Sequence, residues 1–325
     1  MATNTVLMLI DALRFDHVNR ETTPNLMRIA DRGAFFSNAN ACNSSTKQSV
    51  PCILCSDTLY SPDDNVAAVM GSHGYATAMI HSNPIVKEFY GGFAETIDLK
   101  SSRFRVSKSW KKTLRSSLPP QVISAMKRVR ASVYEDDTYL PYSRAAETLE
   151  FTAKWMRSHS RYFLWAHLMD PHIPYYPRKT ALDITKHEMR TLNDKLIESV
   201  HRNYEPSPEE AETAKALYRE DVHEMDEEIG VFMDDFPEDT LLVVTSDHGE
   251  EFGEHGQYSH HGDKMVPVLV HVPLIFCGPG VAQGRVIDDP VSSMSIAPTI
   301  LESCGVAARL GRGESLWGAI REESG

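Results

Sequence analysis

The sequence has few cysteines. Five are spread unevenly over 325 residues, and an odd, scattered set predicts no disulfide framework. We therefore expect a reducing, cytoplasmic location. Cys52 and Cys55 have CxxC spacing, but no second CxxC accompanies them in the sequence. Two buried thiols are therefore the expected interpretation, ahead of a zinc or redox site.

Positive charge and long hydrophobic runs are also scarce. The 33 Lys and Arg residues are outnumbered by 45 Asp and Glu residues, which gives a formal net charge of −12. This excludes a general nucleic-acid binder, because phosphate contacts need a basic face. A small anionic substrate stays compatible, since a metal ion can supply local positive charge. No stretch approaches the roughly 20 apolar residues of a membrane span, and residues 1–5 lack the basic region of a signal peptide, so we expect neither.

Strand and helix signals alternate in the first 100 residues. Val6–Ile10 is expected to be a strand buried on both faces. A helix over 23–32, a strand from Ala34, a helix over 62–73 and a strand over 76–81 follow it. This order predicts an α/β fold in which a mostly parallel sheet has helices on both faces.

Beyond residue 140 the same kinds of signal return. We expect helices over 143–158, 208–236 and 293–304, and strands over 162–168, 241–245 and 268–276. Between these parts, Lys, Arg and Ser dominate residues 100–130, which predicts a basic helical insertion around 100–140. Such a segment is either a solvated helix or a contact surface for an anionic polymer or lipid headgroup. With no internal repeat, one domain over 1–325 is the expected organisation.

Polar residues that directly follow buried strands are the candidates for chemistry, because ligands bind beyond the carboxyl ends of parallel strands. Asp11 follows the first strand, and the pair Asp247-His248 follows the strand over 241–245. Two carboxylates and an imidazole can hold one cation, although a lone carboxylate there also suits a helix cap. Ser49, near Pro51, is expected at a helix N-terminus, as a simple cap or as a hydroxyl facing an anionic ester.

A histidine-rich set follows two strands as well. His172 comes after the strand over 162–168, and His255, His260 and His261 come after the Asp-His pair. Any one of them is more often a surface or core residue, but together they favour a pocket.

Taken in order, these segments resemble the sulfatase branch of the alkaline phosphatase superfamily. The resemblance is carried by Leu9–His17, Thr22–Leu26, Gly33–Ala39, Ser49–Cys52, Met169–Tyr175, Tyr218–Gly230, Ser246–Glu250, Gly253–Gly256, Val272–Ile275 and Ser295–Leu301. It implies that family's helix-flanked, mostly parallel sheet, with the small C-terminal subdomain largely absent.

The resemblance also implies a metal site formed by Asp11, Asp247, His248 and the hydroxyl oxygen of Ser49. Ser49 stands where the family carries its nucleophile motif, Cys/Ser-x-Pro-Ser-Arg. His248 replaces an Asn, which favours Mn²⁺ or Zn²⁺ over Ca²⁺. The motif's Arg is missing, so Ser49 is expected either as formylglycine or as an unmodified hydroxyl, and the latter suits phosphoryl transfer.

In the same resemblance His172 and Lys264 lie near the anionic oxygens of the ester, and His172 or His261 protonates the leaving oxygen. Asp170 and His261 are candidates for a second metal. The expected partner is a small anionic ester, such as a sulfated or phosphorylated sugar. Three hypotheses follow: a sulfate-ester hydrolase first, a phosphodiesterase, phosphonate-ester hydrolase or phospho-group transferase second, and a non-catalytic metal- or glycan-binding relative third.

Overall fold

The structure is a computed structural model that describes residues 4–100 and 139–321. The basic insertion expected around 100–140 therefore lies, apart from its ends, outside the described residues. Within the described ranges, no helix is long and apolar enough to cross a membrane.

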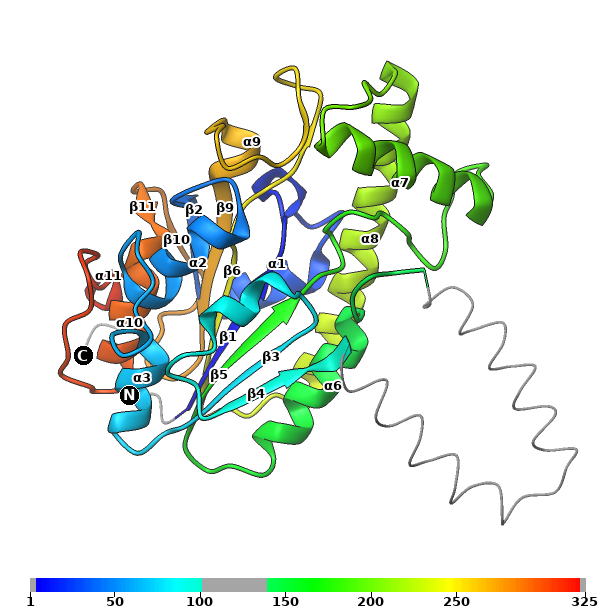
Figure 1. The fold of residues 1–325 in the computed structure, drawn as a ribbon. Helices are drawn as coiled ribbons and strands as arrows, with labels where there is room; N and C mark the ends of the chain where they lie inside the picture. Colours follow the sequence, from blue (N-terminus) through cyan, green and yellow to red (C-terminus); the bar gives the residue numbers. More distant parts are fainter. Residues whose placement is uncertain (1–3, 101–138, 322–325) are drawn as a thin grey trace, which may run out of the picture.

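A nine-stranded sheet forms the centre of the molecule (Figure 1). In order across the sheet, its strands are β10 (Arg285–Ile287), β2 (Ala34–Asn40), β9 (His271–Cys277), β6 (Thr240–Ser246), β1 (Asn4–Ile10), β5 (Tyr162–Leu168), β3 (Ala76–His81) and β4 (Glu95–Asp98), with β11 (Val291–Ser292) also paired to β2. All pairings are parallel except those of β9, which runs antiparallel to β2 and β6. The mostly parallel sheet is thus confirmed.

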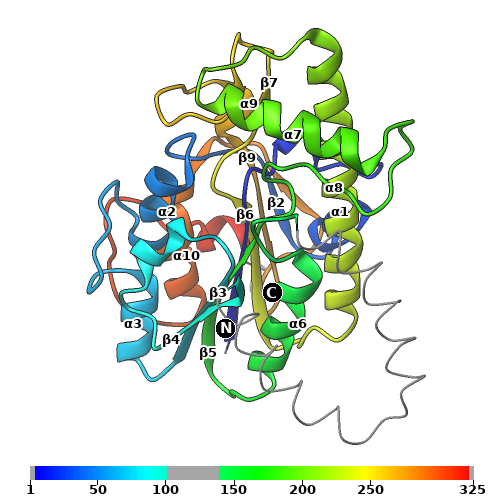
Figure 2. The same cartoon turned by 45° about the vertical axis from the view of Figure 1, so that its right-hand side comes forward.

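Helices cover both faces of this sheet (Figure 2). One core lies under α1 (Pro24–Asp31), α6 (Ala145–Met156) and α8 (Pro208–Asp234), and the other under α2 (Thr46–Cys55), α3 (Val66–Ser72) and α10 (Ile296–Ser303). Strand β1 alternates between the two: Val6, Met8 and Ile10 pack in the first core, and Leu7 and Leu9 in the second. Burial on both faces explains why Val6–Ile10 of β1 is an unbroken apolar run.

The remaining elements are short or lie at the edges. They are η1 (Phe15–His17), η2 (Ile85–Phe89), α7 (Lys186–Val200), the hairpin of β7 (Glu251–Phe252) and β8 (Tyr258–Ser259), α9 (Pro267–Val270), η3 (Ser293–Ser295) and α11 (Trp317–Ile320). In Figure 1, α7, α9 and the hairpin stand beyond the carboxyl ends of the parallel strands. They therefore surround the edge at which ligands are expected.

The central strands appear where the sequence predicts them, but several boundaries differ. Helix α3 begins at Val66 and not near residue 62, because the side chain of Asn65 caps it by accepting a hydrogen bond from the backbone N–H of Ala68. Strand β9 begins at His271, because the preceding residues form α9. Helix α7 was not expected at all.

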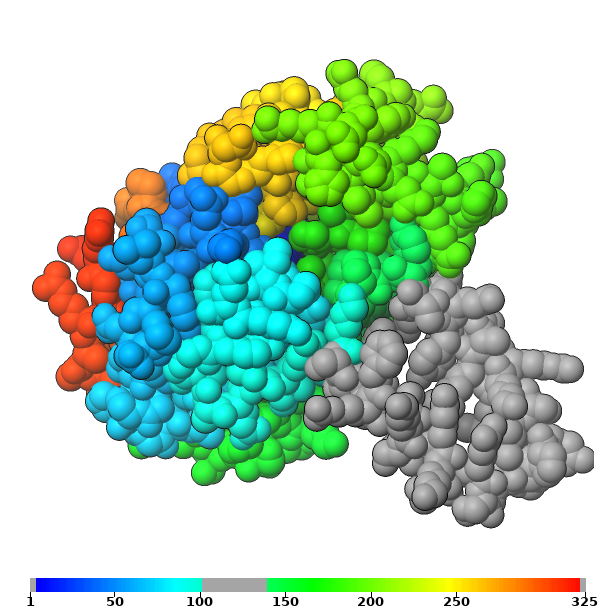
Figure 3. Space-filling view, viewed as in Figure 1, coloured from blue at the N-terminus to red at the C-terminus, as the bar shows by residue number. Residues whose placement is uncertain are grey.

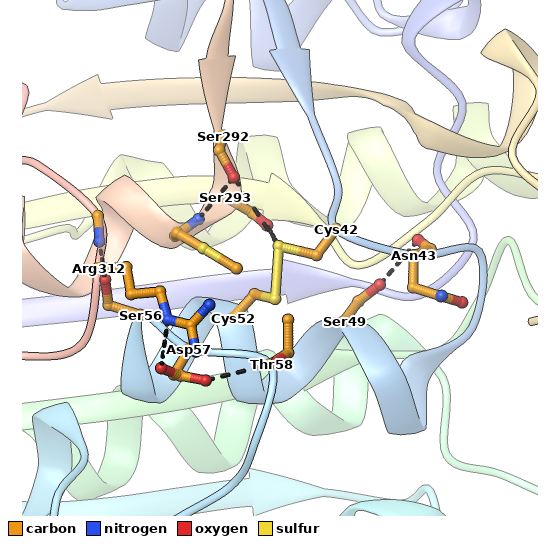
Figure 4. The surroundings of a disulfide bond; sticks show 12 residues. Cys42, Asn43, Ser49, Cys52, Ser56, Asp57, Thr58, Ser292, Ser293 and Arg312 are labelled. Atoms are coloured by element: carbon orange, nitrogen blue, oxygen red, sulfur yellow. Dashed lines mark hydrogen bonds and ion pairs between the residues drawn. A yellow bond between two sulfur atoms is a disulfide. The ribbon is translucent and has the colours of Figure 1, made fainter.

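One expectation about the cysteines is wrong. Cys42, in the loop between β2 and α2, forms a disulfide with Cys52 on α2 (Figure 4). The loop folds back over the helix, which brings the two Cα atoms to 6.4 Å, within the usual range for a disulfide. Cysteine count and spacing argue against a framework of bridges, but they do not exclude a single short one. The cysteine argument for a reducing compartment no longer holds, and the cytoplasmic location stays a prediction.

Candidate metal centre and active site

The ends of β1 and β6 are tied together. Ser246, the last residue of β6, donates its hydroxyl to the carbonyl of Ile10 at 2.6 Å and accepts the backbone N–H of Leu13 at 3.0 Å. Between them the chain turns sharply at Ala12, whose φ of 60° is in the left-handed region. This turn places Asp11 beside Asp247, the first residue after β6.

Asp11, Asp247 and His248 form one buried cluster. One ligand atom from each lies within 4.8 Å of the others. Nε2 of His248 is 3.5 Å from Oδ1 of Asp11 and 3.6 Å from Oδ2 of Asp247. Nδ1 of His248 lies 2.8 Å from the carbonyl of Gly249. An N–H at Nδ1 satisfies that carbonyl and leaves Nε2 as a metal-ligating nitrogen.

The cluster fits a divalent cation. Oδ1 of Asp11 and Oδ2 of Asp247 are buried and have no hydrogen-bond partner among the described residues, although buried carboxylate oxygens are normally paired. Burial lowers the pKa of His248, but the charges of Asp247 and Asp11 outweigh it and place that pKa above its ordinary value. The site therefore attracts positive charge.

Thr46, and not Ser49, provides the hydroxyl beside this cluster. Thr46 is the first residue of α2, and its Oγ1 lies 3.3 Å from Nε2 of His248. Ser49 lies about one turn further into the helix, and its hydroxyl donates to the carbonyl of Asn43 at 2.8 Å (Figure 4). The expected helix start near Pro51 is wrong, because α2 begins at Thr46 and Pro51 lies inside it.

Two further histidines extend from the cluster. The ring of His260 lies 4.1 Å from that of His248 and 5.0 Å from that of His172, measured between centroids. Nδ1 of His260 faces the buried carboxylate of Glu250 at 3.1 Å, and the His260 side chain is 16% exposed. A carboxylate-oriented histidine at the rim of a metal cluster can donate a proton to a bound ligand. Sequence reasoning favoured His261 over its neighbour His260.

Comparison with known proteins agrees with this architecture. The sequence matches the model of the family described as Sulfatase over residues 3–306. The chain belongs to the Sulfatase family. A curated member described as a sulfatase, from Formosa agariphila, is 28% identical over 200 residues, which are 54% of this chain and 38% of that protein. The matched segments therefore span 38% of that sulfatase and 22% of another curated relative, a low-salt glycan biosynthesis sulfotransferase from Haloferax volcanii.

Many solved structures share the fold, including the following two. A phosphonate monoester hydrolase from Silicibacter pomeroyi has a TM-score of 0.64 at 22% identity, covering 98% of this chain and 76% of that one. The soluble domain of lipooligosaccharide phosphoethanolamine transferase A from Neisseria meningitidis has a TM-score of 0.63 at 17% identity, covering 92% and 87%. These likenesses show the alkaline phosphatase-like fold.

Some residues that the family resemblance implied are engaged elsewhere. The Lys264 ammonium bonds both carboxylate oxygens of Glu251 at 2.8 Å and the carbonyl of His255 at 2.8 Å. It therefore braces the β7–β8 hairpin and has no spare donor for an ester. The backbone carbonyl of His261 accepts the hydroxyl of Ser44, and the role predicted for its imidazole stays a prediction.

A second metal at Asp170 and His261 stays a prediction. Among the described residues, the grouping of three ligands that could hold a cation is the Asp11 cluster, which contains neither of them. Burial raises the pKa of Asp170 to about 6 against the opposing charge of Arg144.

Two residues of the site carry no metal-binding pattern in the sequence. Oδ2 of Asp11 lies 3.1 Å from Nε2 of His167 on β5 and accepts the side-chain amide of Asn83 at 3.0 Å. Asn83 is the second residue after the end of β3. The rule that residues after strands line the site identifies Asn83, but His167 lies within a strand, where that rule gives no signal. In the space-filling view, dark blue N-terminal atoms are visible between the gold, green and cyan segments (Figure 3).

Proposed function

We propose that this protein is a metal-dependent hydrolase or transferase of phosphorus esters, with the Thr46 hydroxyl as nucleophile. The observation that supports it is the 3.3 Å approach of Thr46 Oγ1 to Nε2 of His248, at the first residue of α2. Oxidation of a threonine gives a ketone, whereas formylglycine chemistry needs the aldehyde that only Cys or Ser yields. An unmodified hydroxyl suits attack on phosphorus and formation of a covalent phospho-enzyme.

The cation would be held by Oδ1 of Asp11, Oδ2 of Asp247 and Nε2 of His248. When bound, it lowers the pKa of a neighbouring hydroxyl and polarises the oxygens of the ester. Two carboxylates and an imidazole favour Mn²⁺ or Zn²⁺ over Ca²⁺.

The protein's own groups then divide the reaction between them. Oγ1 of Thr46 loses its proton to solvent and forms a bond to phosphorus while the bond from phosphorus to the leaving oxygen breaks. The N-terminus of α2 stabilises negative charge on the phosphoryl oxygens. His260, oriented by Glu250, gives a proton to the leaving oxygen. The oxygen of water, or of an acceptor hydroxyl, then loses a proton to solvent and attacks phosphorus, the bond from phosphorus to Oγ1 breaks, and Oγ1 of Thr46 takes up a proton from solvent.

Two of the solved neighbours support chemistry at phosphorus, since their names describe phosphonate ester hydrolysis and phosphoethanolamine transfer, and the names of others describe sulfatases. The sulfatase from Formosa agariphila supports the second candidate, hydrolysis of sulfate esters with Ser49 or its formylglycine derivative as nucleophile. In either case the expected substrate is a small anionic ester, and a phosphorylated or sulfated sugar stays a prediction.

The two candidates are separated by assay and mass. The Mn²⁺-loaded protein is offered an aryl phosphodiester, an aryl phosphonate monoester and an aryl sulfate. We expect turnover of the phosphorus esters, and a mass increase on the peptide that contains Thr46 when the reaction is quenched in acid. Turnover of the sulfate alone, with the mass loss of aldehyde formation at Ser49, would establish the sulfatase. Mn²⁺ binding without any turnover would instead favour the non-catalytic relative.

A further inference from the structure

The two oxygens of the Asp11 carboxylate have different surroundings. Oδ2 faces two hydrogen-bond partners, Nε2 of His167 at 3.1 Å and the amide of Asn83 at 3.0 Å. Oδ1 is buried without a hydrogen-bond partner among the described residues and lies 3.5 Å from Nε2 of His248. Hydrogen bonds thus fix Oδ2 of the carboxylate, and Oδ1 faces the other two candidate metal ligands, Asp247 and His248.

The backbone of the sheet brings His167 to this position. In the parallel pairing of β1 with β5, Leu9 lies opposite His167, and the N–H of Asp11 bonds the carbonyl of Leu168 at 2.9 Å. The imidazole is fully buried, so its position is set by a strand and not by a mobile loop.

The side chain of His167 has no other hydrogen bond in the described part of the chain. Its Nδ1 is buried and unpaired, and its ring packs against Trp165 at a centroid distance of 5.6 Å. A buried polar group is costly unless its hydrogen bonds are made. An apolar side chain of similar size would serve the core better, so packing alone does not account for a histidine here.

We propose that His167 is a positioning residue that holds Oδ2 of Asp11, with help from Asn83, and thereby reserves Oδ1 for the cation. This inference rests on the metal centre of the proposed function. Partners that orient a metal-ligating side chain typically change metal affinity by about 10- to 100-fold when removed. His167 therefore sets the affinity of the centre without touching the cation or the ester.

His81 provides a matched control in the neighbouring strand. It is also fully buried, and Ile80 pairs with Ala166, so His81 and His167 follow at the same level of the sheet. Nδ1 of His81 is likewise unpaired among the described residues, but its Nε2 lies 2.7 Å from the hydroxyl of Tyr90. The two histidines thus share residue type and burial and differ in whether they contact Asp11.

The test is Mn²⁺ affinity, measured on metal-depleted full-length protein by following the electron paramagnetic resonance signal of free Mn²⁺. We expect H167L to weaken binding by about 10- to 100-fold, and H167Q, whose amide can still donate to Asp11, to restore much of it. H81L should stay within about threefold of the wild type even if its melting temperature falls by as much as that of H167L. N83A, which removes the second donor from the same oxygen, should weaken binding in the same direction if H167L does not fold.

Four results would overturn the inference. Wild-type affinity in folded H167L would show that His167 does not position Asp11, and so would unchanged affinity in N83A where H167L is unfolded. An equal loss of affinity in H81L and H167L would show that the effect is general damage to the sheet. A wild-type protein that binds no Mn²⁺ would remove the metal centre and the proposed function as well, whereas the other results leave that function standing.

Discussion

Thr46 and His248 are 202 positions apart in the sequence, yet the threonine hydroxyl lies 3.3 Å from Nε2 of the imidazole. The contact forms because α2 begins, and β6 ends, at the same edge of the central sheet. His248 also faces both carboxylates of the metal cluster. The hydroxyl, the imidazole and the carboxylates thus meet without any of them being close neighbours of Thr46 in the chain.

The first prediction concerns the nucleophile. Thr46→Ala should lower kcat/KM for an aryl phosphodiester by about 10³-fold or more, because the attacking oxygen is removed. Thr46→Ser keeps a hydroxyl and should retain a measurable part of the activity. Ser49→Ala should keep most of the activity and lose about 1 kcal/mol of stability, since the hydroxyl of Ser49 bonds the carbonyl of Asn43. An inactive S49A beside an active T46A would return the nucleophile to Ser49.

The strands that carry this site can be predicted from the sequence, but the first residue of helix α2 cannot. Val6–Ile10 predicts a buried strand and therefore places Asp11 at the sheet edge, and the same argument locates Asp247 and His248. Ser49 and Pro51 predict a helix start near residue 49, but local helix signals cannot show that α2 begins earlier, at Thr46.

Contacts made through tertiary structure were beyond the sequence as well. His167 looks like any polar residue in an apolar strand until the register of β1 and β5 sets it beside Asp11. From the sequence, Lys264 can bind either a substrate ester or a carboxylate of the protein. The fold of the β7–β8 hairpin places its ammonium against the carboxylate of Glu251. Side-chain partners of this kind depend on packing between distant segments, and the spacing of residues in the sequence does not show that packing.

The second prediction concerns the charge of the metal cluster. Asp247→Asn removes a ligand, so added Mn²⁺ should no longer raise the melting temperature of the variant. In the wild type, Mn²⁺ at 100 times its Kd should add about 2.7 kcal/mol to the free energy of unfolding. In the presence of a chelator the variant should be at least as stable as the wild type, because two buried carboxylates with unpaired oxygens repel each other. Calorimetric melting with chelator and with Mn²⁺ measures both effects.

A control separates the cluster from general charge effects. Asp263→Asn removes an exposed carboxylate that pairs with Arg202, and it should leave the response to Mn²⁺ unchanged. An intact Mn²⁺ response in D247N would exclude Asp247 as a ligand.

The third prediction concerns proton donation to the leaving oxygen. His260→Asn should lower kcat strongly for an alkyl leaving group and little for nitrophenolate, which leaves without a proton. Glu250→Gln should give a weaker effect of the same kind, because the carboxylate orients His260 at 3.1 Å. The slope of log kcat against leaving-group pKa is the measurement. His255 is an exposed histidine of the same loop, and H255N should not change that slope. An unchanged slope in H260N would show that another group supplies the proton.

The fourth prediction is a pH dependence of stability. Burial raises the pKa of Glu254, but the hydrogen bond from Arg14 at 2.7 Å outweighs it and brings the pKa to about 2, from an ordinary value of 4.5. Because the pKa is lower in the folded state, the stabilisation is fully present above about pH 5 and is lost as the pH falls towards 2. After allowance for solvent screening we expect about 1–2 kcal/mol.

Denaturant unfolding of Glu254→Gln between pH 7 and pH 3 tests this. The variant should be less stable than the wild type at pH 7, and the difference should shrink as the pH falls. Asp31→Asn, which breaks an exposed pair with Arg20, should cost little at any pH. A difference between E254Q and the wild type that stays constant with pH would contradict the assignment.

The last prediction concerns the disulfide between Cys42 and Cys52. The two cysteines are ten positions apart in the sequence, so the disulfide closes a short loop, and this loop contains Thr46. A non-reducing peptide map should find the crosslink, and the double variant C42S/C52S should lose about 3 kcal/mol of unfolding free energy through the freedom that its unfolded chain regains. Turnover should fall as well, because the residues before Thr46 are then held by hydrogen bonds alone. Cys304→Ser, a change at a free thiol, should alter neither quantity, and a wild-type protein indifferent to a reductant would show that the bridge does not constrain this loop.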